Sequence, residues 1–237
     1  TREVVIGTHG VDIRTFSKCG LWVEATPGSA AHIVVPDYVK VLNEGLNGII
    51  AEVKSEEASL NIGEVGTLDK WYFYQASNTV LNAMKILGKR YATLARVMAG
   101  KADNVERKLE LEEIAEICER VPENPARNFR EAIQALWFTM LGVWLEAPKA
   151  LTGPPANFTK ALYPFYKQDK DEGRITEEEA IELIQLFFLK INQLAHVLPP
   201  HGLRYNQSRL GQQLSLGCLT ADGEDATNEL DWLVLEA

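Results

Sequence analysis

The side chains best suited to metal binding or nucleophilic chemistry are few and far apart in this sequence. They are four histidines and three cysteines: His9, His32, His196, His201, Cys19, Cys118 and Cys218. No histidine belongs to an H-E-x-x-H motif or an i, i+4 pair, and no two cysteines have metal-ligand spacing, so the sequence predicts no metal site. Three distant cysteines also make no disulfide framework, which favours a reducing, cytoplasmic compartment.

Other catalytic patterns are missing as well. No G-x-S-x-G nucleophile motif occurs, and Gly7-Thr8-His9-Gly10 does not lead from a strand into a helix, as a phosphate-binding turn would. The acidic runs Glu110–Glu113 and Glu177–Glu179 are typical of solvated helix faces. The residues alone therefore predict a folded domain but not its chemistry.

The 237-residue chain is acidic, with 24 Lys and Arg against 33 Asp and Glu and a net charge of −9. Its 46% apolar and 24% charged residues are typical of a folded domain and exclude wholesale disorder. The acidic balance argues against a nucleic-acid or anionic-membrane partner. We expect no membrane span, because no apolar run approaches ~18 residues, and no secretory signal.

Apolar residues recur at three- and four-residue steps over most of the chain, which predicts a mostly helical structure. The apolar face of its longest helix includes Phe73, Val80, Tyr91, Leu94 and Met98. The expected helices run from Pro36 to about residue 53, from an Asp69 cap to about Ala99, from an Asn104 cap to just before Pro122, over residues 126–146, from Phe158 to about Asp171, after a Thr176–Glu179 capping box, and after an Asp225 cap.

Strand signals are weaker. Gln213–Leu219 alternates with period two and is the best candidate, whereas Val4–Ile6 and Leu21–Val23 are short and less regular. Pro148–Pro155 has no periodicity and predicts a loop. Residues 1–35 are irregular, and no linker divides the chain into two domains.

Six ordered segments carry a family resemblance. They are Pro36–Leu42 with Gly45 and Gly48, Arg90–Ala95, Ile114–Phe129 running on to Phe138, Leu162–Tyr166, Gly173–Ala180 and Asp222–Leu230. In this order and spacing they resemble the pyruvate formate-lyase domain of glycyl radical enzymes, closest in pattern to the diol dehydratase and arylacetate decarboxylase branch.

The resemblance implies an α/β fold, a ten-stranded barrel of two antiparallel half-barrels wrapped by helices. Residues 1–237 would be part of that domain, mostly α-helical with one or two barrel strands near the C-terminus. The implied division is an irregular segment over 1–35, the helical wrap over 36–210, and a barrel strand with its following helix over 211–237. The C-terminal glycyl radical domain would be absent.

The resemblance also implies a reaction. A radical-SAM activating enzyme makes a backbone glycyl radical, which passes to a cysteine thiyl that abstracts hydrogen from a small organic substrate. The outcome is radical C–C or C–X cleavage by a lyase, dehydratase or decarboxylase, and the full-length enzyme is expected to be a homodimer.

The family's two radical residues have no match in this chain. The thiyl cysteine belongs to a C-x-E motif, but Cys19, Cys118 and Cys218 are followed two residues later by Leu, Arg and Thr. The radical glycine belongs to an R-V-x-G motif, which neither Arg96-Val97 nor Arg120-Val121 continues. We therefore expect no catalytic residue here and no turnover by the chain alone. The first residue, Thr1, and an uncapped final helix also suggest a trimmed chain.

Three residues are candidate substrate contacts by resemblance: His32, Thr152 and Asn157. In relatives a His shortly before the Pro-Asp-Tyr segment can face the substrate, and an S-x-G-R-x-D-Q type segment precedes Leu-Tyr-Pro. Here Pro154, Asn157 and Thr159 replace its Ser, Arg and Asp. This weakens polyol dehydration and would suit an aryl or hydrocarbon substrate. The alternative for Thr152 and Asn157 is a surface loop.

A second class of function remains open at this point. The chain could be a non-catalytic helical scaffold or binding module that keeps the family fold. A natural stop after Ala237 would favour that alternative, whereas a reading frame that continues to C-x-E and R-V-x-G would favour the enzyme.

Overall fold

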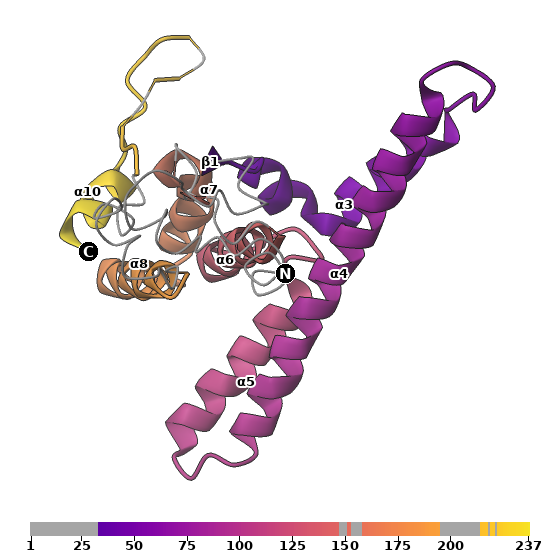
Figure 1. Cartoon of the computed structure of the whole chain (residues 1–237). Helices are drawn as coiled ribbons and strands as arrows, with labels where there is room; N and C mark the ends of the chain where they lie inside the picture. Colours follow the sequence, from indigo (N-terminus) through magenta and orange to yellow (C-terminus); the bar gives the residue numbers. More distant parts are fainter. Residues whose placement is uncertain (1–32, 147–150, 153–157, 195–213, 218, 221) are drawn as a thin grey trace, which may run out of the picture.

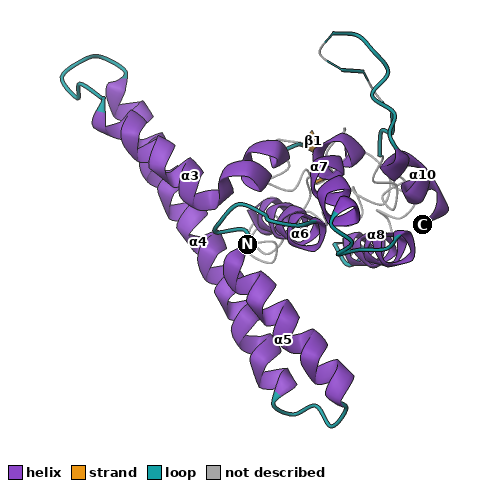
Figure 2. Cartoon of the chain, turned by 180° about the vertical axis from the view of Figure 1, so that it is seen from behind, coloured by secondary structure: helices purple, strands orange, loops and turns teal. Residues whose placement is uncertain are grey.

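The computed structural model describes residues 33–146, 151–152, 158–194, 214–217, 219–220 and 222–237. Helices dominate these residues (Figure 2). In chain order the elements are β1 (Ile33–Val34), α3 (Tyr38–Ala58), α4 (Thr67–Ala99), α5 (Val105–Arg120), α6 (Phe129–Glu146), β2 (Leu151–Thr152), α7 (Phe158–Asp171), α8 (Glu177–Asn192) and α10 (Glu229–Glu236).

The helices form two regions (Figure 1). The arm consists of α3, α4 and α5: α3 lies along the first part of α4, and α5 returns along the last part. The packed group consists of α6, α7, α8 and α10, which lie together to one side of α4. The arm meets the packed group mainly through α6, which contacts α3, α4 and α5.

Helix α3 changes direction at Gly45, whose φ is 65°. A Cβ at this position would lie 2.4 Å from the carbonyl carbon of Asn124, so only glycine fits both the conformation and the space. The kink leaves backbone amides and carbonyls of α3 without partners inside the helix, and the segment 122–126 forms hydrogen bonds with them. The amide of Leu46 donates to the carbonyl of Pro122 (2.9 Å), and the amide of Ala126 donates to the carbonyl of Leu42 (3.0 Å).

Small residues let α4 and α5 approach closely. Gly88, Ala92, Ala95 and Ala99 are buried on α4, and the carbonyl oxygen of Cys118 would lie 3.0 Å from a Cβ at position 88. The large residues of the expected apolar face are instead exposed, although Tyr91 also packs edge-on against Phe138 of α6 (5.6 Å). The expected apolar face is thus largely uncovered, because α4 contacts its neighbours through its small residues.

The core of the packed group is built around α6. Residues 126–146 were expected to form a helix apolar on more than one face, and α6 indeed buries residues all around its first three turns. Phe158 of α7 stacks on Phe187 of α8 at 5.5 Å. The largest fully buried side chains of the packed group are Phe129, Leu136, Phe138, Met140, Phe158, Leu162, Tyr166, Ile184, Phe187 and Leu230.

The helix caps were predicted with mixed success. Asn104 accepts from the amide of Arg107, and Thr176 with Glu179 forms a reciprocal capping box, both as predicted. The Asp69 prediction is wrong, because α4 begins at Thr67 after Gly66. The Asp225 prediction is also wrong: Asn228 caps α10, three residues later, and pairs with Asp231 in a second capping box.

The strand predictions need correction. Within the described part of Gln213–Leu219 there are isolated bridges but no strand, and Leu219 pairs with Asp225 in an antiparallel bridge. Gly217, at φ 75°, interrupts the extended chain. The predicted 148–155 loop instead contains β2, which pairs in parallel with β1. The candidates Val4–Ile6 and Leu21–Val23 lie outside the described residues, as does most of the 1–35 segment.

Candidate functional site

The three candidate substrate contacts lie at or next to described elements, two of which pair with each other. His32 immediately precedes β1, Thr152 ends β2, and Asn157 immediately precedes α7. In the parallel pair Ile33 lies opposite Leu151 and Val34 lies opposite Thr152. His32, Asn157 and the side chain of Thr152 lie outside what the structure describes. The strand that follows His32 and the strand that ends at Thr152 are therefore neighbours, although they lie far apart along the chain.

The first turn of α7 is anchored in three directions. Phe158 is fully buried against Phe187 of α8. Thr159 is 1% exposed, and its Oγ1 donates to Asp231 Oδ1 at 2.6 Å. Lys160 Nζ donates to the carbonyl of Leu219 at 3.3 Å. This turn, which follows directly on the candidate residue Asn157, is therefore fixed to α8, to α10 and to the segment before α10.

Asp231 of α10 is the centre of a buried polar link. Its Oδ1 also accepts from the amide of Gly217 (3.0 Å), and its Oδ2 accepts from the amide of Asn228 (2.8 Å). The carboxylate is 3% exposed, and none of the described Lys or Arg side chains forms an ion pair with it. Sequence reasoning missed this residue. The N-x-x-D spacing of a capping box could have indicated its place at the start of a helix.

A second buried carboxylate, Glu131 of α6, joins α5 to α6. Its oxygens accept from the backbone amide of Arg127 (2.8 Å) and from Arg127 Nε (3.0 Å), and Arg120 Nε of α5 lies at 3.3 Å. Burial raises the pKa of Glu131, but the Arg127 hydrogen bonds and the two guanidinium charges outweigh it, so the pKa lies below its ordinary value. These contacts tie α5 and the segment before α6 to α6, which is a structural role.

The described residues contain little that could react. Cys118 is buried, and desolvation raises the pKa of its thiol to about 11, so it is protonated near neutral pH and inert. All four histidines, Cys19 and Cys218 lie outside the described residues. Over the described ranges, no three or more His, Cys, Asp or Glu side chains are grouped to hold a metal. No described helix is long and apolar enough to cross a bilayer.

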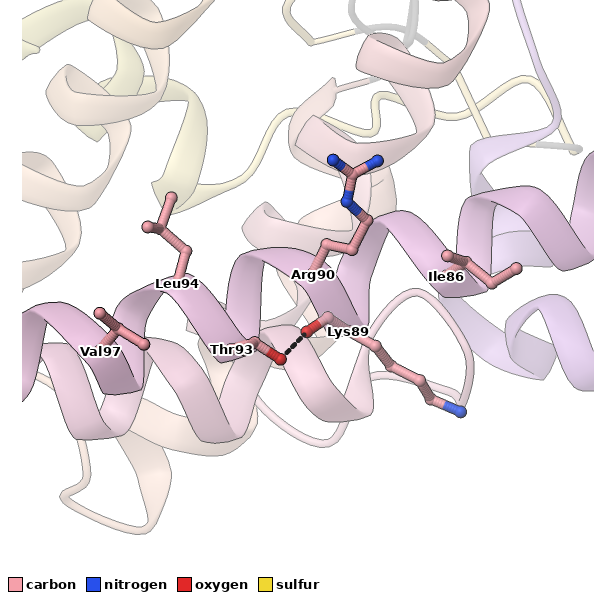
Figure 3. Close-up of a pocket in the computed structure, with 6 residues that line it drawn as sticks. All are labelled: Ile86, Lys89, Arg90, Thr93, Leu94 and Val97. Atoms are coloured by element: carbon pink, nitrogen blue, oxygen red, sulfur yellow. Dashed lines mark hydrogen bonds between the residues drawn. The ribbon is translucent and has the colours of Figure 1, made fainter.

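One apolar depression follows the exposed side of α4 (Figure 3). It is lined by Ile86, Lys89, Arg90, Thr93, Leu94 and Val97. All six side chains come from a single helix, so no second element faces a ligand there. The hydroxyl of Thr93 donates to the carbonyl of Lys89 (2.9 Å) and is already used within the helix. The depression is part of the uncovered apolar face of α4 and lacks converging polar groups, so we do not assign the site to it.

Comparison with known proteins decides the family. Residues 2–237 match the model of the pyruvate formate lyase-like family. The chain belongs to this family. Its homologues are glycyl radical enzymes, among them lyases, dehydratases and decarboxylases, as the ordered segments predicted.

Three relatives illustrate the similarity. The isethionate sulfite-lyase of Oleidesulfovibrio alaskensis is 38% identical over 206 residues, 86% of this chain and 25% of that protein. The indoleacetate decarboxylase of Tractidigestivibacter scatoligenes is 33% identical over 226 residues, 93% of this chain and 25% of that protein. The glycerol-bound B12-independent glycerol dehydratase of Clostridium butyricum matches with a TM-score of 0.80 and 32% identity, over 88% of this chain and 26% of that one.

The chain therefore spans about a quarter of the length of the relatives it matches. Its helices superpose on part of a glycyl radical enzyme fold.

Proposed function

We propose that this chain is the substrate-side helical portion of a glycyl radical enzyme that performs radical C–C or C–X cleavage on a small organic substrate. Two observations support the proposal: the family match over residues 2–237 of this chain, and the β1–β2 pair, in which Ile33 and Val34 lie opposite Leu151 and Thr152. In this proposal, the helices within residues 36–210 wrap part of a ten-stranded barrel. His32, Thr152 and Asn157 border the substrate.

The radical itself is assigned to residues outside this chain. Neither Arg-Val pair has the expected glycine: Arg96-Val97 lies within the last turns of α4, and Arg120-Val121 leads into Pro122. The described cysteine, Cys118, is buried and its thiol pKa is raised, which does not suit a residue that must meet a substrate. No step of the radical reaction is therefore assigned to this chain. A radical-SAM activating enzyme is the proposed partner, acting on the complete enzyme, which we expect to be a cytoplasmic homodimer.

The substrate subclass can be tested on the relatives' own substrates. The departures at Pro154, Asn157 and Thr159 weigh against a polyol and suit an aryl substrate. The similarity to isethionate sulfite-lyases adds C–S cleavage of a sulfonate as a second candidate. We expect turnover of isethionate or of an arylacetate by the activated complete enzyme, and little or no turnover of glycerol. Efficient glycerol dehydration would contradict this preference.

Electron paramagnetic resonance tests the proposal as a whole. After treatment with the activating enzyme, the complete polypeptide should show a glycyl radical signal and the 237-residue chain should show none. A signal from the chain alone would overturn the assignment of the radical to residues outside it. A complete polypeptide that shows neither signal nor turnover would instead favour a non-catalytic helical scaffold.

A further inference from the structure

The exposed side of α4 is an apolar surface whose lining comes from that helix alone among the described elements. Ile86, Leu94 and Val97 line the depression in Figure 3, and they are 59%, 53% and 49% exposed. Ile86 and Val97 lie about three helical turns apart and so share one side of the helix, whereas the buried Ala95 lies on the opposite side. Exposed apolar surface of this kind is typical of a face that binds another protein surface.

Arg90 lies in the middle of this surface and forms no ion pair with any described carboxylate. Its neighbour Lys89 is paired with Glu123 of the segment before α6 (2.7 Å). Water solvates the Arg90 charge here, because the side chain is exposed. A surface that closed over this side of α4 would remove that water and would have to supply a carboxylate in its place. The other arginines that the structure describes all form ion pairs: Arg96, Arg107, Arg120, Arg127, Arg130 and Arg174.

We propose that this side of α4 docks against an apolar surface in the part of the complete polypeptide that lies outside residues 1–237, and that a carboxylate of that surface pairs with Arg90. The inference rests on the proposed function, in which this chain is one portion of a longer enzyme. The chain spans about a quarter of the length of its relatives, so most of the protein that could cover α4 lies outside it. Arginine is also well suited to such a contact, because it pairs with a carboxylate while its stem packs on apolar side chains.

A second copy of the chain is the rival occupant of this surface. Helix α4 contains one acidic residue, Asp69 in its first turn. An antiparallel pair of α4 helices would therefore offer Arg90 a single carboxylate, in a single register. This rival predicts that Asp69 matters as much as Arg90 does. The rest of the polypeptide is not restricted in this way, and under our proposal Asp69 is dispensable for docking.

Photo-crosslinking of the complete polypeptide identifies the occupant. Benzoylphenylalanine replaces Leu94, and irradiation followed by peptide mass spectrometry shows which residues lie against α4. The control position is Val65, which is 106% exposed in the turn before α4. We expect position 94 to crosslink to a peptide outside residues 1–237, in a product with the mass of one polypeptide. Position 65 should give a yield lower by about fivefold or more, because no docking surface is assigned to it.

The crosslinked product separates the possible occupants. A product with the mass of two polypeptides would identify a second copy and overturn the proposal. A crosslink to a peptide within residues 1–237 would overturn it too, and the absence of any crosslink from position 94 would show that this side of α4 faces solvent. Equal yields from positions 94 and 65 would show that the label does not report docking at α4, and would also count against the proposal.

Cysteine labelling tests the role of Arg90. In the complete enzyme, a maleimide should label Leu94→Cys about tenfold or more slowly than Val65→Cys, because docking shields position 94. Adding Arg90→Glu to Leu94→Cys should raise that labelling rate about fivefold or more, since a carboxylate would then face a carboxylate. Lys101→Glu is the matched control: it reverses another exposed cation that has no ion pair among the described residues, two positions after α4 ends, and should change the rate less than twofold.

The remaining outcomes decide against one part or another. An equal effect of Lys101→Glu would assign the change to net charge and overturn the Arg90 pair. An effect of Asp69→Asn as large as that of Arg90→Glu would favour the second copy. Neither experiment needs a radical or a substrate. A complete enzyme that gives the expected crosslink but no turnover would therefore count against the proposed function alone, and turnover without the crosslink would count against the docking surface alone.

Discussion

The arm and the packed group hold their helices together by different means. In the packed group, aromatic and aliphatic side chains fill a shared core, and buried carboxylates such as Asp169 and Asp231 connect the helices. In the arm, the contact between α4 and α5 runs through small residues and surface ion pairs such as Arg96–Glu119, while Leu94 is 53% exposed. Large apolar residues therefore fill a shared core in the packed group, whereas many of those on α4 are exposed, although their spacing is helical in both regions.

The comparison is tested most strongly in the core of the packed group. Phe187→Ala should lower the free energy of unfolding by about 3–5 kcal/mol, because it removes a buried ring that stacks on Phe158 and leaves a cavity. Urea unfolding of the chain, followed by circular dichroism, measures this change. A loss below about 1 kcal/mol would mean that the packed group is loosely packed after all.

The kink of α3 should be the next most sensitive position. Gly45→Ala places a side chain in a left-handed conformation and against the backbone of Asn124, so we expect a loss of about 2–4 kcal/mol. Gly173→Ala is the matched control, because Gly173 has φ 69° but no atom within 4 Å of its missing Cβ. Gly173→Ala should lower the free energy of unfolding only by the cost of a side chain at positive φ, about 1 kcal/mol. Equal losses in the two variants would show that the close approach of Asn124 is unimportant.

The junction between the two regions should depend on pH. Glu131 has a folded-state pKa below its ordinary value of 4.5, so its contribution to stability is complete above about pH 4.5 and is lost as the pH falls through the folded-state pKa. Glu131→Gln should cost about 1–3 kcal/mol at neutral pH and reduce the acid dependence of unfolding. Urea melts at pH 7 and pH 3 measure both effects. If the free energy of unfolding of the variant falls with acid pH as much as before, other carboxylates are responsible for that fall.

The smallest effect is expected on the uncovered face of the arm. Leu94→Ala should change the free energy of unfolding of the chain by less than about 0.5 kcal/mol, because the side chain is mostly exposed. The neighbouring Ala95→Leu, on the buried side of the same helix, should cost about 1–3 kcal/mol by overpacking against α5. A reversed order would show that Leu94 is covered in solution.

Much of the fold could be predicted from the sequence, and what could not has physical reasons. Helix positions follow from apolar spacing and local caps, so Asn104 and the Thr176 capping box were found. Asp225 is a turn residue whose Oδ1 accepts a hydrogen bond from the amide of Thr227. The helix begins only after Asn228, and the structure was needed to show this. The face that α4 buries depends on the helices that pack against it, α3, α5 and α6, and the sequence of α4 alone does not specify them.

The candidate site was less predictable. The family follows from ordered segments, but the pairing of β1 with β2 involves two residues in each strand, too few for a period to be recognised. Asp231 was missed because its three donors come from positions 159, 217 and 228. The substrate contacts His32, Thr152 and Asn157 stay predictions.

The docking of segment 122–126 into the bend of α3 has a consequence for biosynthesis. The groups that Gly45 exposes find their partners about 80 residues later in the chain, which makes this a long-range closure. A nascent polypeptide that has passed only the arm's first hairpin still lacks those partners. The bend of α3 therefore reaches its final shape only after the ribosome has delivered the segment 122–126.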